Sequence, residues 1–467
     1  MKTESISIST VSNLGDKRLN IRLENLVEEL ANDVTSTIPN ACKNTSSTKG
    51  AYRFFSNKKV SASAIIEAHY KTMKLSANSQ GETERILVLS DTTELDYTGK
   101  RASDNLGSLN YEKRKGILFH NSMIVSEVGV PLGHLKQTYW SRDAKYFGES
   151  DKRRKLPLEE KESFRWYDHY KATEELCKQT PYLEAVYIAD READFMELLA
   201  ARTCPNAHML IRSQYNRNLK GETLKLHDFL AQQPLSYTYT ASIIHPKTKK
   251  IRTADLEVRF SPVTLQLQRK HPSGYTIEPV QLNAIEVREI NPPQDIDKPI
   301  KWVLLTTLDV DIQQQAEQII AYYILRWLIE RFFYLLKTGG SNVEELQLKT
   351  QDRLENAIAT YSISVMNVMK MRYLAENHPD TPINQVGITP QEHEALYTVM
   401  QQRYPNKIKY NPDDIPTIEE YCIILGMLGG FQPSKRQPLP GLKILTRAFD
   451  KYHLILDIFF ITNMSKN

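Results

Sequence analysis

The period of the apolar residues changes along the chain, and each change predicts a different kind of element. Up to about residue 75 the apolar residues recur at helical spacing, which predicts three short helices capped by Asp16, Thr48 and Ser61. From residue 85 onward, short apolar runs of strand length take over. These runs predict buried strands at 85–90, 117–125, 130–140, 184–189, 208–212 and 302–307.

The segment between residues 235 and 300 alternates apolar and polar residues between turn-rich joints, which predicts an antiparallel β insertion. Its strands are expected at 237–244, 254–260, 263–267 and 282–288. Helical patterns occupy most of the remaining chain. They predict helices at 159–178, 195–200, 313–338, 341 to about 376, and 390–403, and two more between residues 418 and 460.

The order of these elements predicts an α/β protein with a mixed sheet, an antiparallel β insertion and helical parts at both ends. We divide the chain into a helical domain over residues 1–75, an α/β domain over 76–375, and a helical domain over 376–467. The α/β domain contains the β insertion at about 230–300.

Composition narrows the class of protein. The chain has 467 residues, enough for several cores, with 41% hydrophobic residues, 25% charged residues and a net charge of +4. Its four cysteines form no CxxC pair, which argues against a zinc module or a disulfide framework and favours a reducing compartment. The N-terminus resembles no secretory signal, and the apolar run 454–462 is interrupted by Asp457 and is too short to span a bilayer.

One polar stripe runs along the helix predicted over residues 313–338. At about 100° per residue, four polar side chains fall within a band about 60° wide; they are Tyr323, Arg326, Glu330 and Lys337. The rest of this helix is rich in Leu, Ile, Phe and Trp. Because an unpaired buried charge is costly, the stripe needs a polar partner, and a metal ion with phosphates would suit both signs of charge.

Two further carboxylates follow predicted buried strands, Asp91 after the first and Asp190 after the fourth. A mixed sheet with flanking helices can gather these two and Glu330 at one end. Three oxygen ligands without His or Cys suit Mg²⁺ or Mn²⁺, and two such ions about 4 Å apart would clamp the attacking and leaving oxygens of a phosphodiester. Each acid also has a structural alternative: a turn or cap for the aspartates, and a salt bridge for Glu330. For Glu192 and Asp194 the structural alternative is a solvated first helical turn.

The stripe has the spacing Tyr323-x2-Arg326-x3-Glu330-x6-Lys337. That spacing resembles the YREK signature of the bacterial cut-and-paste DDE transposases, of the Tn-five type in the IS-four group of insertion sequences. Other motifs similar to this family occur in order along nearly the whole chain: Leu14-Gly-Asp-x-Arg18, Gly50-Ala-Tyr-Arg-Phe54, Asp91-Thr-Thr, Asp190-Arg-Glu-Ala-Asp194, Glu289-Ile-Asn-Pro-Pro, Trp302-x-Leu-Leu-Thr, Leu428-Gly-Gly-Phe and Ser434-Lys-Arg436. The match is patchier at the N-terminus, and little after Gly441 resembles the family.

The resemblance implies a ribonuclease-H-like catalytic core, interrupted by the β insertion, in which Asp91, Asp190 and Glu330 bind two Mg²⁺ or Mn²⁺ ions. It implies that residues 1–75 bind the terminal repeats of a transposable element and that residues 376–467 dimerise. The homodimer would pair two double-stranded DNA ends, and each protomer would cut the end bound mainly by the other. Water would free a 3′-OH, which would form a hairpin with the opposite strand. After the hairpin is opened, the 3′-OH would join target DNA at the nucleoid, in the bacterial cytoplasm.

The same resemblance implies further DNA contacts. Tyr323, Arg326 and Lys337 would hold phosphates beside the metal ions. Trp302 matches the position at which an aromatic ring accepts a flipped base, and Arg212 matches an arginine near the bent DNA end. The structural alternatives are a core residue for Trp302 and a surface charge for Arg212. The candidates for contacts with the end sequence are Arg18, Arg22 and Arg53.

Three functions are to be distinguished. The first is an active transposase. The second is a DNA-binding or inhibitory relative that dimerises without cutting, which the complete set of acids and YREK residues opposes. The third is a stand-alone metal-dependent nuclease, against which Trp302 and the terminal helical domains argue. A glycosidase could also use two acids, but the cations beside Glu330 favour an anionic substrate.

Overall fold

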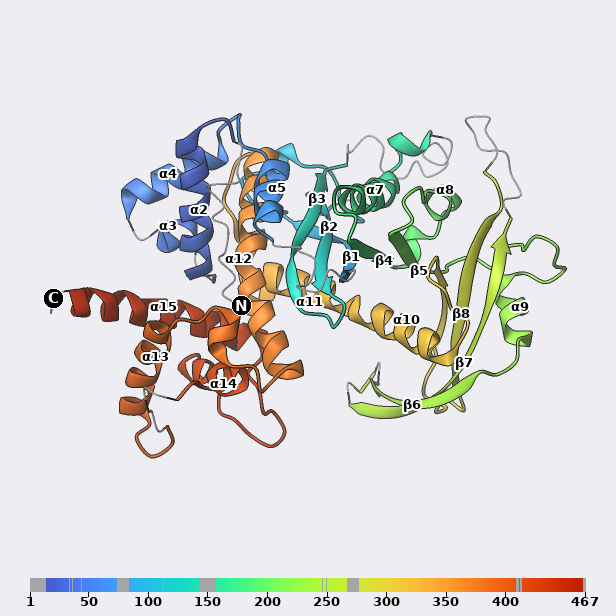
Figure 1. The fold of residues 1–467 in the computed structure, drawn as a ribbon. Helices are drawn as coiled ribbons and strands as arrows, with labels where there is room; N and C mark the ends of the chain where they lie inside the picture. The colour runs from blue at the N-terminus through green and yellow to red at the C-terminus, as the bar shows by residue number, and fades with distance from the viewer. Residues whose placement is uncertain are drawn as a thin grey trace. The chain divides into compact units, whose positions relative to one another are not determined.

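We describe the protein from a computed structural model. It describes residues 14–32, 34–35, 37–42, 44–73, 84–111, 113–142, 156–245, 247–248, 250–266, 277–408, 411 and 414–464. The chain forms two compact units. The first unit comprises Met1–Lys74, Thr92–Phe147 and Ile329–Asn467, and the second comprises Leu75–Asp91 and Gly148–Leu328. The predicted α/β class with a mixed sheet and flanking helices is confirmed (Figure 1).

Helices make up most of the first unit. They are α2 (Lys17–Asn32), α3 (Ile38–Ala41), α4 (Thr45–Phe55), α5 (Ala62–Thr72), α12 (Gln351–Asn377), α13 (Pro390–Arg403), α14 (Ile418–Leu428) and α15 (Leu442–Met464). The long helix α12 is the centre of this unit, and α2, α4, α5, α14 and α15 all pack against it (Figure 1). Its middle turns are buried almost without interruption, because neighbours cover it on several sides.

Of the capping residues predicted for the helices α4 and α5, one is correct and one is wrong. Ser61 caps α5 as predicted, because its side chain accepts a hydrogen bond from the Ala64 amide at 3.2 Å. The prediction of Thr48 as a cap is wrong. Helix α4 begins at Thr45, and the side chain of Asn44 accepts from the Ser47 amide at 2.8 Å.

The strands of the first unit are the second half of β1 (Glu84–Asp96) and the antiparallel hairpin of β2 (Gly116–Ser126) and β3 (Pro131–Trp140). Helix α5 packs on β3. A short 3-10 turn, η1 (Ser103–Asn105), lies in the segment that leads from β1 to β2. The predicted helix from residue 341 is wrong at its start. Asn342 has a left-handed backbone (φ 46°), the 3-10 turn η6 (Val343–Glu345) follows, and α12 begins only at Gln351.

The second unit holds the larger part of the sheet. Its strands are the first half of β1, β4 (Leu183–Ala189), β5 (Ala207–Arg212), β6 (Tyr237–Ile244), β7 (Ile251–Leu265), β8 (Val280–Ile290) and β9 (Lys301–Thr306). Strands β1, β4 and β5 are parallel, whereas β9, β8, β7 and β6 continue the sheet with antiparallel pairs. In the described part of the chain, the strand order is β3-β2-β1-β4-β5-β9-β8-β7-β6.

The antiparallel β insertion is confirmed, with one change. Strand β6 has the predicted bounds, whereas the two strands predicted at 254–260 and 263–267 form the single strand β7; residue 267 lies outside the described residues. The helices of this unit are α7 (Phe164–Gln179), α8 (Met196–Leu199), α9 (Leu226–Gln232) and α10 (Gln313–Leu325), and its 3-10 turns are η3 (Leu158–Glu160) and η4 (Arg191–Ala193). Helix α9 was not predicted, and α8 is only one turn long.

The helix predicted over residues 313–338 is divided. Helix α10 ends at Leu325, Arg326 lies at the junction, and α11 (Trp327–Tyr334) follows. A π-helical turn, η5 (Leu335–Gly339), ends the segment. The polar stripe therefore does not run along one straight helix, because the junction and the π turn change the angular position of the residues beyond them.

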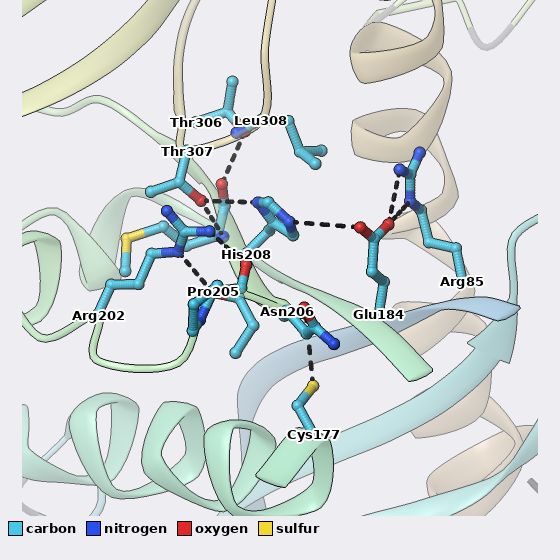
Figure 2. A network of polar contacts seen from close by, with 12 residues as sticks. Arg85, Cys177, Glu184, Arg202, Pro205, Asn206, His208, Thr306, Thr307 and Leu308 are labelled. Carbon is cyan, nitrogen blue, oxygen red and sulfur yellow. Dashed lines mark hydrogen bonds and ion pairs between the residues drawn. The ribbon is translucent and has the colours of Figure 1, made fainter. Parts of the chain in front are cut away.

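A polar network fixes the beginnings of the parallel strands in the second unit (Figure 2). Arg85 donates to Glu184 across the β1–β4 pair, with nitrogen–oxygen distances of 2.9 and 2.7 Å. His208 on β5 lies 4.0 Å from the same carboxylate and 3.4 Å from the hydroxyl of Thr307. Arg85 also donates to the hydroxyl of Tyr322 on α10 at 3.3 Å. These contacts connect the beginnings of β1, β4 and β5 with one another and with helix α10.

Candidate active site and DNA-binding segment

Asp91 and Asp190 come two residues after the paired stretch of two neighbouring parallel strands. The pairing of β1 with β4 runs in register to Leu89 and Ile188. Asp91 lies two residues after Leu89 in β1, and Asp190 lies two residues after Ile188, just beyond β4. Both side chains are half-buried. The prediction that the strand ends at Asp91 is wrong, because β1 continues to Asp96. Asp190 follows β4 directly, and its side chain caps η4 by accepting from the Glu192 amide at 2.9 Å.

Arg326 is the ion-pair partner of Asp91. Its Nη1 atom donates to Oδ2 of Asp91 at 2.7 Å, and the two side chains are 16% and 17% exposed. The position of Arg326 at the junction of α10 and α11 directs its guanidinium to the sheet.

Aromatic rings and arginines continue from this ion pair. The guanidinium of Arg326 lies 5.9 Å from the ring of Tyr323, and that ring meets Trp302 edge to face at 5.4 Å. The guanidinium of Arg212 lies 5.9 Å from the Trp302 ring, and its Nη2 donates to the carbonyl of Lys301 at 3.1 Å. The structure thus brings together four residues singled out in the sequence.

The charges of this cluster affect one another. Burial raises the pKa of the Tyr323 hydroxyl, while Arg326 and Arg212 act against that shift and Asp190 adds to it. Burial also lowers the pKa of the Arg212 guanidinium, and the nearby cations Arg191 and Arg326 act in the same direction. A phosphate near Arg212 would relieve the repulsion among these cations. The cluster is therefore electrostatically suited to an anion.

Glu330 and Lys337 belong to the first unit, because the boundary between the units falls after Leu328, inside α11. Glu330 is half-buried. Lys337 lies in the π turn η5, and its ammonium donates to the carbonyl of Glu94 at 2.7 Å and lies 3.6 Å from the carboxylate of Glu344. Asp91 and Asp190 lie in the second unit. Among the described residues, no group of three or more His, Cys, Asp and Glu side chains is arranged to hold a metal ion.

The pair of aspartates nevertheless has the chemistry of a divalent-cation site. Asp91 and Asp190 supply carboxylate oxygens just after the paired stretch of adjacent strands, and oxygen donors are the ligands that Mg²⁺ and Mn²⁺ prefer. The donor set of this pair therefore fits such an ion.

The N-terminal helices carry the other predicted contacts. Arg18 is 91% exposed in its side chain and pairs with Asp16 at 3.1 Å. Arg22 is half-buried, and its Nη1 donates to the Ser47 hydroxyl at 3.3 Å. It lies so close to α4 that a Cβ on Gly50 would stand 2.7 Å from its guanidinium. Arg22 thus ties α2 to α4, which the sequence did not reveal.

Helix α4 presents one polar face. The exposed residues of the helix and its C-terminal cap recur at helical spacing, and they are Thr45, Ser46, Lys49, Tyr52, Arg53 and Ser56. The helix contains no acidic residue. Its opposite side buries Ala51, Phe54 and Phe55. A helix with a basic face that also carries hydroxyls can contact both phosphates and base edges.

This N-terminal segment matches a known family. Residues 8–60 match the family model of the transposase DNA-binding domain. The match includes α2, α3 and α4, and it supports a transposase that binds DNA through its N-terminal part. Residues 8–13 of it lie outside the described part of the chain. Within the described residues, every helix is too short or too polar to cross a bilayer.

Asp194 is a residue whose role the sequence did not reveal. The expectation of a solvated helical turn is wrong for it, since Asp194 is only 2% exposed and accepts several hydrogen bonds from the segment after β5. Glu192 is exposed and pairs with Arg165 at 2.6 Å. One signal for this role was present in the sequence. Three cations, Arg212, Arg217 and Lys220, occur at and after the end of a buried strand, and such a group favours a nearby carboxylate.

Proposed function

We propose that this protein is a DDE transposase that cuts and joins DNA at the ends of a transposable element. The observation that carries the proposal is the cluster Asp91–Arg326–Tyr323–Trp302–Arg212 in a chain whose N-terminus matches a transposase DNA-binding domain. A half-buried carboxylate, two arginines and a half-buried indole ring suit a phosphodiester with an unstacked base. No other class weighed from the sequence uses all of these groups.

We infer a ribonuclease-H-like core for the catalytic part. The strand order β3-β2-β1-β4-β5 begins with an antiparallel hairpin and ends with parallel strands, which supports this inference. Asp91 and Asp190 follow the paired stretches of its two central strands. The β insertion, β6 to β8, joins this core through β9.

In the proposed reaction, Asp91 and Asp190 would hold Mg²⁺ or Mn²⁺, and the family resemblance assigns Glu330 as the third ligand. When bound, two such ions lower the pKa of the attacking water and stabilise the leaving oxygen. Arg326, which forms an ion pair with Asp91, would also bind a phosphate oxygen through its guanidinium. Lys337, whose ammonium is oriented by Glu94, would contribute a second cation.

The hairpin step would use the aromatic part of the cluster. A hairpin requires a sharply bent strand, and a base that leaves the stack needs a new surface. Trp302 would supply that surface, and Arg212 would bind the adjacent phosphate. The pairing of two ends by a homodimer through residues 376–467, and the joining of the 3′-OH to target DNA at the bacterial nucleoid, complete the proposal by resemblance to the family.

One assay separates the three functions. The purified protein is incubated with Mg²⁺ and a supercoiled plasmid that carries its own element ends. We expect excision with hairpinned ends. Binding without cleavage would instead indicate an inhibitory relative, and cutting that ignores the end sequence would indicate a nuclease.

The matched variants in this assay are Glu330→Ala and Glu317→Ala. Glu330→Ala should abolish cleavage while end binding, measured by gel shift, is retained. Glu317 is an exposed residue of α10 that bonds only to Gln313 among the contacts described, so its replacement should change neither property. Cleavage by Glu330→Ala at the wild-type rate would overturn the assignment of the third acid.

A further inference from the structure

Asp194 is a buried carboxylate surrounded by donors from one short segment. Its Oδ2 accepts from the amides of Gln214 at 2.6 Å and Tyr215 at 3.0 Å, and from the Ser213 hydroxyl at 3.3 Å. Its Oδ1 accepts from Nε and Nη2 of Arg217 at 3.1 and 2.7 Å. Nη2 of Arg217 also donates to the backbone carbonyl of Asp194 at 2.7 Å. One carboxylate thus organises residues 213–217.

The two segments that Asp194 joins both lead to the proposed active site. Asp194 stands four positions after Asp190 and follows the single turn η4. Residues 213–217 follow directly after Arg212, the last residue of β5. The Ser213 amide donates to the carbonyl of Val303 at 2.7 Å, beside Trp302. Asp194 therefore ties the exit of β4 to the exit of β5.

The hydrogen bonds of Asp194 fix the backbone of residues 213–217 as well as stabilising the fold. Burial of a carboxylate is costly, and the cost is offset only when several donors have good geometry. Here the donors include two consecutive backbone amides, which fix the path of the chain and not only a side chain. Arg212 is the residue immediately before the anchored segment. Pairing with Leu304 of β9 holds its backbone on one side, and the anchored segment fixes the chain that leaves it on the other.

We propose that Asp194 is a positioning residue that holds Arg212 on the face of Trp302 and so controls the hairpin step. This inference rests on the proposed function. Asp194 itself touches neither DNA nor the reacting atoms. Its loss should leave Asp190 in place, because β4 is held by pairing with both β1 and β5. First-strand cleavage should then survive, whereas hairpin formation should suffer.

The first test needs no DNA. Hydrogen–deuterium exchange is compared between the wild-type protein and Asp194→Asn. The asparagine replaces one acceptor oxygen with an NH₂ donor, which then faces either Arg217 or the loop amides. We expect faster exchange at the amides of residues 213–217 and unchanged exchange in β4. Unchanged protection in residues 213–217 would overturn the positioning role, whatever the activity of the protein.

The second test measures the two chemical steps separately, on intact ends and on ends that already carry the 3′-OH nick. Asp194→Asn should keep the nicking rate within about twofold and lower the hairpin rate on the order of a hundredfold, the scale expected for a misplaced contact group. Equal loss of both steps, at a wild-type melting temperature, would overturn the inference. Failure of the wild-type protein to cut would overturn the proposed function, while the exchange result would still decide the role of Asp194.

Two further variants control this experiment. Asp228 accepts a hydrogen bond from Asn216 in the same loop at 2.8 Å but bonds to none of its backbone amides among the contacts described, so Asp228→Asn should change neither rate. If Asp194→Asn does not fold, Arg217→Lys provides a milder change, since it keeps the charge and loses the fork. Its hairpin rate should fall while nicking is retained. A wild-type hairpin rate in this variant, with loosened loop amides, would contradict the inference.

Discussion

The guanidinium of Arg326 donates to the carboxylate of Asp91 at 2.7 Å, across 235 positions of the chain. Both side chains are largely shielded from solvent. The arginine therefore balances the charge of one of the two aspartates, and in the proposed function it also binds a phosphate. Arg326 thus forms an ion pair with Asp91, and its guanidinium also lies over the ring of Tyr323.

Replacing Arg326 by lysine tests this dual role. Lysine keeps the charge but loses the planar fork that can bind Asp91 and a phosphate together. We expect the single-turnover cleavage rate to fall on the order of a hundredfold, as for the loss of one charge-stabilising donor. The melting temperature should change little, because lysine keeps a positive charge beside the carboxylate of Asp91. Rates and melting curves of the purified variant provide the measurement.

Arg85 offers a matched control, because it is an arginine of β1, the strand that carries Asp91, and it also forms an ion pair with a carboxylate. It pairs with Glu184 at the beginning of β1, whereas Arg326 contacts Asp91 near the end of the parallel stretch. Arg85→Lys should leave cleavage unchanged. If both variants cleave like the wild type, Arg326 is only a counterion of Asp91, and its proposed contact with phosphate is wrong.

Trp302→Ala should separate the hairpin step from the first cleavage. The ring lies between Arg212 and Tyr323, where a flipped base could stack. Loss of base stacking costs about 1–3 kcal/mol, or about 5- to 150-fold. Hairpin formation on nicked ends should slow by this factor while nicking continues. The fluorescence of 2-aminopurine placed at the DNA end would report the stacking directly.

Trp302→Phe is the companion variant, because it retains an aromatic face and should restore most of the hairpin rate. A structural role for Trp302 gives a different result. In that case alanine would lower the melting temperature and impair both steps alike, and the assignment of a base-stacking surface would be withdrawn.

The sequence predicted those elements whose signals are local. Strand β6 has the predicted bounds because its residues alternate strictly between inward and outward positions. Helix α13 begins at Pro390 and is fixed by the capping box of Thr389 and Glu392. The antiparallel insertion was equally readable, since turns separate its strands. In each case the information lies within a few residues of the element.

The sequence failed where distant contacts decide. No Gly or Pro near Arg326 marks the end of α10, and the partner of Arg326, Asp91, lies 235 positions away in β1. The burial of Asp194 depends on a loop 19 and more positions away. The aspartate pair, by contrast, was predictable as residue types, but its register required the β1–β4 alignment. The three-domain division and the roles of the site residues stay predictions.

Two buried histidines of the first unit make its stability depend on pH. Burial lowers the pKa of His69 to about 4 and that of His134 to about 3, from 6.5 in both cases. The unfolded chain therefore binds protons that the folded chain rejects. Their contribution to stability is complete above pH 6.5 and falls as the pH drops from 6.5 toward 4, by at most about 1.4 kcal/mol per pH unit for each histidine. Urea unfolding between pH 7 and pH 5 measures this slope.

His69→Phe should reduce that slope, because one of the two groups no longer titrates. A slope that does not change in His69→Phe would show that this histidine is not the source of the acid sensitivity.

Arg53→Ala should weaken DNA binding without affecting the fold. Arg53 is exposed on the polar face of α4, within the segment that matches a transposase DNA-binding domain. A contact with one phosphate contributes about one unit to the slope of log K against log salt. We expect a lower affinity for the element end, a slope reduced by about one, and an unchanged melting temperature. Titrations at several salt concentrations measure the affinity and the slope, and a thermal unfolding curve measures the melting temperature.

Arg22→Ala should behave differently, although it removes the same charge from the same segment. Arg22 donates to Ser47 and packs against Gly50, so its loss should lower the melting temperature as well as the affinity. If Arg53→Ala binds like the wild type at every salt concentration, the exposed face of α4 does not meet the DNA. If instead the salt slope of Arg53→Ala equals that of the wild type, while the variant no longer discriminates among base pairs at one position of the end, Arg53 contacts a base and not a phosphate.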